Sequence, residues 1–214
     1  SLIQGYIGYG DFHNALDVFH NMEKAHVYPS GFTLQAALKS CANLKYLSKG
    51  QEIHANLVMK GLDEDPFLCS GLIDMYSKCC IFEEASRVLL DMPFRDVVSW
   101  NSIISGYAEN GCHQGVLDLF QQMEDDHILP NYWTLACVLR TCGILCNIDK
   151  GRKIHSEAIL RGFEDDPYIG NALVYMYANL GLLDTSYRLF DKLQVQDVIS
   201  WNALIGGYLE HGQD

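Results

Sequence analysis

The sequence predicts an all-α solenoid of stacked antiparallel helix–turn–helix repeats, and two observations support this fold class. The chain repeats itself at a spacing of 101 residues without insertion or deletion, so that Ser-Trp-Asn at residues 99–101 returns at residues 200–202. Apolar residues recur at helical spacing, whereas no stretch shows the alternation of period two that marks a strand. Such a period indicates repeats that bury their core between neighbours.

Each 101-residue period divides into units of 35, 35 and 31 residues. One complete period comprises residues 97–131, 132–166 and 167–197. The other units are two from the preceding period and an incomplete unit at each end of the chain, namely residues 31–65, 66–96, 1–30 and 198–214. Because the chain opens and stops inside a unit, we expect it to be a fragment of a longer array.

The unit at residues 97–131 shows why each repeat is predicted to be a helical hairpin. Ile103, Ile104 and Tyr107 mark the apolar face of a first helix, and Gly111 is a natural helix stop. In a second helix, apolar residues recur at i, i+3, i+4 and i+7 from Val116 to Met123. Pro130 then ends the unit. Two such helices cannot bury both apolar faces alone, so neighbouring hairpins must stack.

Composition and charge limit the functional classes. Hydrophobic residues make up 49% of the 214 residues, and no run of about 18 apolar residues predicts a membrane span. The formal net charge of −12 argues against a nucleic-acid partner. The charge is uneven, however, because residues 97–131 hold five acids and no Lys or Arg, whereas residues 132–166 hold five acids and five bases.

The eight cysteines are interpreted as reduced thiols in an intracellular helical-repeat protein rather than a disulfide framework. The three cysteines between residues 137 and 146 lack the paired spacing of a structural zinc site. Cys142, whose counterpart one period earlier is Cys41, is predicted to be a small core residue. The neighbouring Cys79 and Cys80 are predicted to be free thiols at a turn.

No catalytic, metal or cofactor site is predicted. His54 and His155 occupy equivalent positions, but neither has a second potential ligand at metal-binding spacing, so we expect packing or hydrogen-bonding residues. The zinc deaminase signature is absent, and we expect no enzymatic activity from this segment.

The unit lengths and three motifs together resemble the pentatricopeptide repeat family. The motifs are Ser-Trp-Asn-Ser-Ile-Ile-Ser-Gly-Tyr at residues 99–107, Lys-Gly-Arg-Lys-Ile-His at 150–155 and Gly-Asn-Ala-Leu-Val-Tyr-Met-Tyr-Ala at 170–178. The alternation of 35, 35 and 31 residues is similar to the land-plant PLS subclass, built of P, L and S motifs. The resemblance covers the whole chain.

This resemblance implies a right-handed α-solenoid that binds single-stranded RNA in mitochondria or plastids, most often for C-to-U editing or processing. Residues 97–131 would be a P motif, with partial P motifs at 1–30 and 198–214. The L motifs would be 31–65 and 132–166, and the S motifs 66–96 and 167–197. A deaminase would then lie in a further domain or in another protein.

The resemblance also implies which side chains read bases. Repeats of this kind read one base each with two or three side chains, and in the family these are the fifth and last residues of a motif. The implied pairs are Ser70 with Asp96 for guanine, Asn101 with Asn131 for a pyrimidine leaning to cytosine, and Asn171 with Asp197 for uracil. Asn202 opens a further pyrimidine reader, and Ser30 closes a first motif.

The L motifs carry less regular pairs, Gln35 with Asp65 and Ala136 with Asp166. Ala136 has no side-chain hydrogen-bonding group, so base selectivity is expected to be weak at these steps. Relatives of this kind recruit small plant organellar editing-factor proteins through their L motifs, which makes residues 31–65 and 132–166 candidate protein-docking surfaces.

In the family, the second residue of each motif sandwiches the base against the next motif. Base–aromatic stacking contributes about 1–3 kcal/mol per base. The alternative is that regularly spaced aromatic residues belong to the core. The six stacking candidates are Phe32, Phe67, Val98, Trp133, Tyr168 and Ile199.

A protein-binding solenoid of the tetratricopeptide type is the alternative function. The net charge and the segment without basic residues favour it, whereas the 31-residue unit and the recurring Asn at the fifth position disfavour it.

Overall fold

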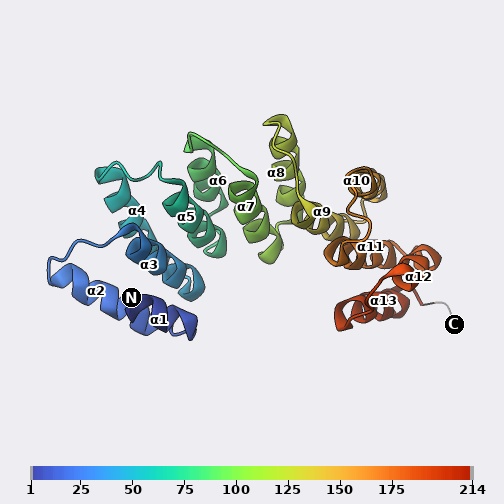
Figure 1. Ribbon diagram of the computed structural model, residues 1–214, viewed down its shortest axis with the longest axis horizontal. Coiled ribbons are helices and arrows are strands. Elements are labelled where there is room, and N and C mark those ends of the chain that lie inside the picture. Colours follow the sequence, from blue (N-terminus) through green and yellow to red (C-terminus); the bar gives the residue numbers. More distant parts are fainter. Residues whose placement is uncertain (1, 213–214) are drawn as a thin grey trace. The chain divides into compact units, whose positions relative to one another are not determined.

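The computed structural model describes residues 2–212, within which all regular structure is helical. Ser1, Gln213 and Asp214, at the outer ends of the two incomplete units, lie outside the described residues. The predicted all-α repeat fold is confirmed. The helices of the described part, labelled in Figure 1, are α1 (Leu2–Gly8), α2 (Phe12–Lys24), α3 (Gly31–Leu44), α4 (Leu47–Met59), α5 (Pro66–Lys78), α6 (Phe82–Asp91), α7 (Val97–Glu109), α8 (His113–Asp125), α9 (Tyr132–Ile144), α10 (Ile148–Leu160), α11 (Pro167–Asn179), α12 (Leu183–Lys192) and α13 (Val198–His211).

The chain forms two compact units, Ser1–Asn110 and Gly111–Asp214. In the first unit, α3 packs on α1 and α5, and α7 packs on α5; in the second, α11 packs on α9 and α13. The backbones of the even-numbered helices pack only on odd-numbered neighbours, and the described even-numbered helices meet one another through side chains, as in the ion pair between Lys49 on α4 and Glu23 on α2. Within each unit, the odd-numbered helices therefore form one continuous layer, to which the even-numbered helices attach.

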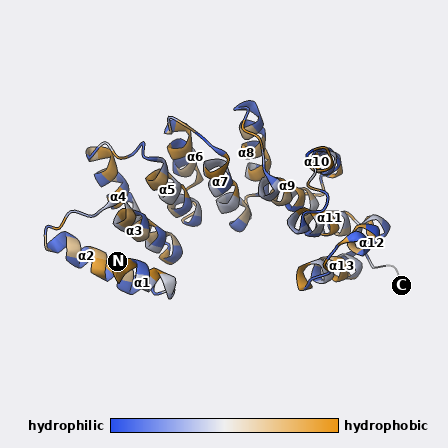
Figure 2. Ribbon diagram, in the orientation of Figure 1, coloured by the Kyte–Doolittle hydropathy of each residue, from blue (hydrophilic) through white to orange (hydrophobic). Residues whose placement is uncertain are grey.

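Burial follows these two layers. The odd-numbered helix α11 buries eight residues, whereas α12 buries two. Hydrophobic and hydrophilic residues share the even-numbered helices (Figure 2), as expected for helices with one packed face and one solvated face.

Each odd-numbered helix from α3 to α13 begins immediately after a residue whose side chain caps it. The side-chain oxygen accepts a hydrogen bond from a backbone N–H two or three residues further on, which satisfies a donor that the helix leaves unpaired. These helices start at the residues with which the predicted 35- and 31-residue units begin. The six capping residues are Ser30, Asp65, Asp96, Asn131, Asp166 and Asp197.

The repeated Ser-Trp-Asn tripeptide now has a structural explanation. Asp96 Oδ1 accepts from the Ser99 N–H at 2.9 Å, and the Asp96 N–H donates to Ser99 Oγ at 3.0 Å, which forms a capping box. Trp100 is fully buried. At residues 99–101 the tripeptide therefore supplies part of the capping box, a core residue and the fifth residue of the unit, whereas Trp201 of the second occurrence is 46% exposed.

The turn and thiol predictions are confirmed. Gly111 has a φ of 75°, a left-handed conformation that suits glycine after the end of α7. Cys80 lies in the equivalent turn after α5 with a φ of 61°, and it is a free thiol like Cys79. Cys41 and Cys142 are fully buried core residues.

The two predicted hydrogen-bonding histidines join an even-numbered helix to the following odd-numbered one. His54 Nδ1 lies 2.8 Å from the Tyr76 hydroxyl, and His155 Nδ1 lies 2.9 Å from the Tyr177 hydroxyl. Burial lowers the pKa of both histidines. Both therefore act as neutral structural residues, as expected.

None of the described helices has the length and apolar character of a membrane span.

Glycine allows the closest approach between the odd-numbered helices. A methyl group on Gly106 would collide with Ser77 on α5, and one on Gly207 would collide with Ala178 on α11. The counterpart of Gly106 one period earlier, Gly5, has no neighbouring atom at that position.

We expect Gly106→Ala to lower the free energy of unfolding by about 1–3 kcal/mol, because the added methyl group forces α5 and α7 apart. Gly5→Ala, the matched control, should be neutral or stabilising by up to about 1 kcal/mol, since alanine favours the helix. Urea unfolding followed by circular dichroism measures both. Equal effects of the two changes would contradict the close packing of α7 on α5.

Candidate functional site

The clearest pairing of two predicted site residues joins Asn171 and Asp197. Asn171 is the fifth residue of its unit and lies on α11, whereas Asp197 is the last residue and caps α13. Asn171 Nδ2 donates to the two Asp197 carboxylate oxygens at 3.1 and 3.3 Å. Because α11 and α13 are adjacent, the last residue of a unit returns beside the fifth residue of that unit.

Hydrogen bonds keep the Asp197 carboxylate charged. The Ser200 N–H donates to Asp197 Oδ1 at 2.8 Å, and this backbone bond is the largest cause of a lowered pKa for Asp197, to which the Asn171 amide also contributes. The pair presents carboxylate acceptors together with the remaining amide groups of asparagine. Such an edge can recognise a partner that offers an N–H donor between acceptors.

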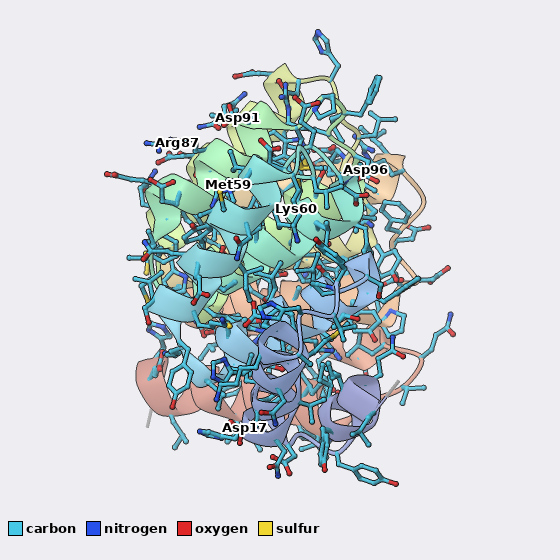
Figure 3. All side chains as sticks on the ribbon, turned by 90° about the vertical axis from the view of Figure 1, so that its left-hand side faces the viewer. Asp17, Met59, Lys60, Arg87, Asp91 and Asp96 are labelled. Atoms are coloured by element: carbon cyan, nitrogen blue, oxygen red, sulfur yellow. The ribbon has the colours of Figure 1, made fainter. Side chains whose placement is uncertain are left out.

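Ser70 and Asp96, the fifth and last residues of the repeat at residues 66–96, are less directly connected than Asn171 and Asp197. Ser70 is half-buried on α5 and its hydroxyl donates to the Phe67 carbonyl at 2.8 Å. Asp96 is exposed at the start of α7, and its carboxylate accepts from the Val98 and Ser99 N–H groups. Figure 3 shows Asp96 on the side of the molecule opposite Arg87 of α6.

The remaining predicted readers lie on odd-numbered helices or immediately before them. Asn101 belongs to the first compact unit and Asn131 to the second. Asn101 is half-buried on α7, and Asn131 Oδ1 accepts from the Thr134 N–H at the start of α9. Asn202 is exposed on α13, and Ser30 Oγ accepts from the Thr33 N–H at the start of α3.

The L-type units differ from this arrangement at their fifth positions. The Gln35 side chain extends from α3 to α5, where its Nε2 donates to Ser70 Oγ at 3.4 Å. Ala136 is buried in α9, with 8% of its surface exposed. Asp65 and Asp166, the last residues of these units, cap α5 and α11 through backbone N–H groups.

The second residues of the units are mostly exposed rather than core residues. Exposed fractions run from 46% for Phe67 to 67% for Phe32, and Trp133 alone of the six is half-buried. The Phe32 and Phe67 rings meet edge to face with centroids 5.4 Å apart, so a base could lie between them only if they separated. The other exposed members of this row are Val98, Tyr168 and Ile199.

Sequence reasoning missed two features of this surface. The last residue of each complete unit caps the next helix, which the run of Ser, Asp and Asn before apolar segments could have indicated. Tyr132 was also missed: its ring, and not that of Trp133, lies 5.9 Å from the Tyr168 ring at an interplanar angle of 31°.

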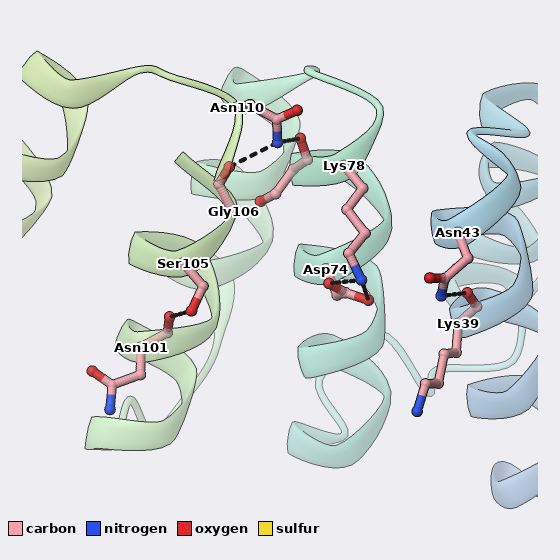
Figure 4. Close-up of polar contacts among 9 residues, drawn as sticks. Lys39, Asn43, Asp74, Lys78, Asn101, Ser105, Gly106 and Asn110 are labelled. Atoms are coloured by element: carbon pink, nitrogen blue, oxygen red, sulfur yellow. Dashed lines mark hydrogen bonds and ion pairs between the residues drawn. The ribbon is translucent and has the colours of Figure 1, made fainter. Parts of the chain in front are cut away.

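The odd-numbered helices carry balanced charge. Their exposed face continues from the fifth residue to Lys39, Asn43, Asp74 and Lys78, and Figure 4 shows the Lys78–Asp74 ion pair of 3.1 Å on α5. Three basic and three acidic residues lie within the odd-numbered helices, so their charges cancel. The negative charge therefore belongs to the even-numbered helices and to the connecting segments. The six residues are Lys39, Lys78 and Arg140 against Asp74, Glu109 and Glu210.

Comparison with known proteins identifies the class. The model of the PPR repeat family matches residues 95–143, and a PPR repeat model matches residues 1–27 and 199–213. Pentatricopeptide repeat-containing protein At3g12770 of Arabidopsis thaliana is 37% identical over 214 residues, which cover 99% of this chain and 31% of that protein. The Arabidopsis protein At1g15510, chloroplastic, is 38% identical over 210 residues, which cover 97% of this chain and 24% of that protein. The chain thus spans about a third or less of these relatives.

The fold has solved counterparts. The pentatricopeptide repeat protein PPR10 in complex with an 18-nt psaJ RNA element matches 95% of this chain with a TM-score of 0.74 and 19% identity, over 30% of its own length. PPR10 from maize matches 91% of this chain, and 29% of its own, with a TM-score of 0.69 and 19% identity. Stacked helical hairpins define a helical-repeat protein. The chain belongs to the pentatricopeptide repeat family.

We expect Asn171→Ala to raise the pKa of Asp197, because the amide hydrogen bonds that favour the carboxylate are lost while the Ser200 N–H remains. Since folding lowers this pKa below 3.8, the stabilisation by the carboxylate is present above that value and is lost as the pH falls below it. NMR titration of the carboxyl carbon measures the shift. Asn202→Ala is the control and should leave the titration unchanged. An unchanged titration in Asn171→Ala would contradict the Asn171–Asp197 pairing.

Proposed function

We propose that this chain is a sequence-selective binding segment for single-stranded RNA that reads one base per hairpin. The hydrogen bond between Asn171 and Asp197 carries this proposal, because it joins the fifth and last residues of one unit into a single polar edge. Uracil offers one N–H between two carbonyl oxygens, and the charged carboxylate beside an amide complements that arrangement.

Three further observations support RNA as the ligand. The exposed row of Phe32, Phe67, Val98, Tyr168 and Ile199 lies at the starts of the odd-numbered helices, beside the polar pairs, where bases could stack. The odd-numbered helices carry no net charge within their bounds, so this layer adds no negative charge beyond the four capping carboxylates of Asp65, Asp96, Asp166 and Asp197. PPR10, which shares the fold, has been solved with RNA.

The unit lengths further assign the chain to the PLS subclass, with editing or processing of an organellar transcript as its role. Several relatives are named chloroplastic, which supports a plastid, with mitochondria as the other organelle of this class. In this assignment, the chain selects the RNA and a deaminase supplied elsewhere performs any C-to-U conversion.

Protein docking is the second candidate function, and the L-type units favour it. Their second helices expose apolar residues at equivalent positions: Met59 is 76% exposed on α4 and Leu160 is 87% exposed on α10. Neither helix contributes to the polar pairs. Small plant organellar editing-factor proteins are the proposed partners of this surface, and they could bind while RNA occupies the odd-numbered helices.

We expect the chain to bind 5′-UGCUUC-3′ at least about tenfold more tightly than 5′-UGAUAA-3′, because each unmatched hydrogen bond costs about 1 kcal/mol. Fluorescence anisotropy at moderate salt measures both affinities. The six bases are assigned in order to the units that begin at residues 31, 66, 97, 132, 167 and 198. The mismatched RNA therefore has purines at the steps of Asn101, Asn171 and Asn202. Equal binding of the two RNAs would refute base selectivity, and no binding of either would favour the protein-docking function.

Asn101→Thr and Asn171→Thr should change the preferred base at their own steps, because a hydroxyl replaces an amide that has both donor and acceptor. The unfolding midpoint should change little, since neither side chain belongs to the core. Anisotropy with all four bases at each step, together with circular dichroism, tests this. Loss of the fold would show that these asparagines are structural.

A further inference from the structure

The amide of Gln35 crosses from α3 to the neighbouring reader on α5. Gln35 Nε2 donates to Ser70 Oγ at 3.4 Å, while Ser70 Oγ donates its own proton to the Phe67 carbonyl at 2.8 Å. A serine hydroxyl has one donor and two acceptor sites. With the donor and one acceptor site occupied inside the protein, Ser70 can only accept a hydrogen bond from a ligand.

The space for this amide is made by a glycine. A methyl group on Gly71 would collide with the Gln35 side-chain amide, so the two residues fit only because Gly71 has no side chain. Oε1 of Gln35 is buried without a hydrogen-bond partner among the described residues. The amide is therefore held by its packing on Gly71 and by its bond to Ser70.

The second period fills the same space in a different way. Its counterparts of Gln35 and Gly71 are Ala136 and Ala172, which are 8% and 2% exposed. A long side chain over glycine in one period thus corresponds to two methyl groups in the other. The reader that follows Ala136 is Asn171, and it is positioned by Asp197 instead.

We infer that Gln35 is a positioning residue that sets the base preference of Ser70, the reader of the next unit. Through its bond to Ser70 Oγ, Gln35 holds the hydroxyl in the orientation that donates to the Phe67 carbonyl, and so presents Ser70 to a base as an acceptor. Guanine offers N–H donors at both N1 and N2, whereas adenine offers its N6 amino group beside an acceptor at N1. Gln35 therefore favours guanine over adenine at this step. This inference rests on the proposed RNA-reading function.

The test uses Gln35→Ala, Gly71→Ala and the double variant, with 5′-UGCUUC-3′ and 5′-UACUUC-3′ as probes. Gln35→Ala removes the bond that holds this orientation, so the Ser70 hydroxyl can turn away from the Phe67 carbonyl and donate to adenine N1, and the guanine-to-adenine affinity ratio should fall about 3- to 10-fold, the worth of one hydrogen bond. Gly71→Ala should lower the ratio similarly, because its methyl group displaces the amide. The double variant should match the single ones, since all three remove one interaction.

Preference at the Asn171 step is the internal control. The ratio of affinities for 5′-UGCUUC-3′ and 5′-UGCUCC-3′ should be the same in wild type and all variants, and thermal unfolding should confirm that each variant is folded. A guanine preference unchanged in folded Gln35→Ala, or absent from wild type, would overturn the role of Gln35. Equal losses at both steps would show that Gln35 is only structural, which also overturns it. Failure of wild type to bind either RNA would instead refute the proposed function.

Discussion

The hydrogen bond from a side-chain oxygen to the first N–H groups of the odd-numbered helices from α3 to α13 governs the arrangement of the candidate site. A helix leaves these donors unpaired, so an acceptor must stand just before its first residue. In this chain, that acceptor is also the last residue of the preceding unit. Because adjacent odd-numbered helices pack together, the cap of α13 lies beside Asn171 on α11. The 31-residue units keep a capping residue as their last residue, since their shortening falls largely on the even-numbered helices: α6 and α12 have 10 residues, whereas α4 and α10 have 13.

The separation into two layers also explains how an acidic chain can carry a proposed RNA-binding surface. Charge on the even-numbered helices has structural partners there, as in the Lys49–Glu23 ion pair of 2.8 Å that joins α4 to α2. The odd-numbered helices lack such a surplus. On the face of the polar pairs, the negative charge therefore comes from the four capping carboxylates of Asp65, Asp96, Asp166 and Asp197, whereas the rest of the net charge of −12 lies on the even-numbered helices and in the other connecting segments. Screened repulsion from the even-numbered layer lowers the association rate with RNA more than it affects contacts to individual bases.

Much of this could be predicted from sequence, because periodicity and helix signals are local. The 101-residue period and the helical spacing of apolar residues indicated the stacked hairpins, and Gly111 indicated a turn. The contacts between neighbouring units could not be predicted in this way. The bond of Gln35 to Ser70 depends on how closely α3 approaches α5, and that distance depends on the missing side chain of Gly71. The Asn171–Asp197 bond likewise joins residues 26 positions apart, whose contact arises only from stacking.

Capping restricts which residues can occupy the last position of a unit. Only side chains with a short, well-placed acceptor cap a helix effectively, which limits the choice to Ser, Thr, Asp and Asn. All six last residues in this chain belong to that set. In the proposed function, the same atom group must both hold a helix start and face a base, so the last position can vary only in charge and in donor capacity. The larger chemical variety is left to the fifth position, which has no capping duty and spans Gln, Ser, Asn and Ala here. Where the fifth residue bonds to the reader of the next unit, as Gln35 does to Ser70, the base preference of that reader depends on two neighbouring units.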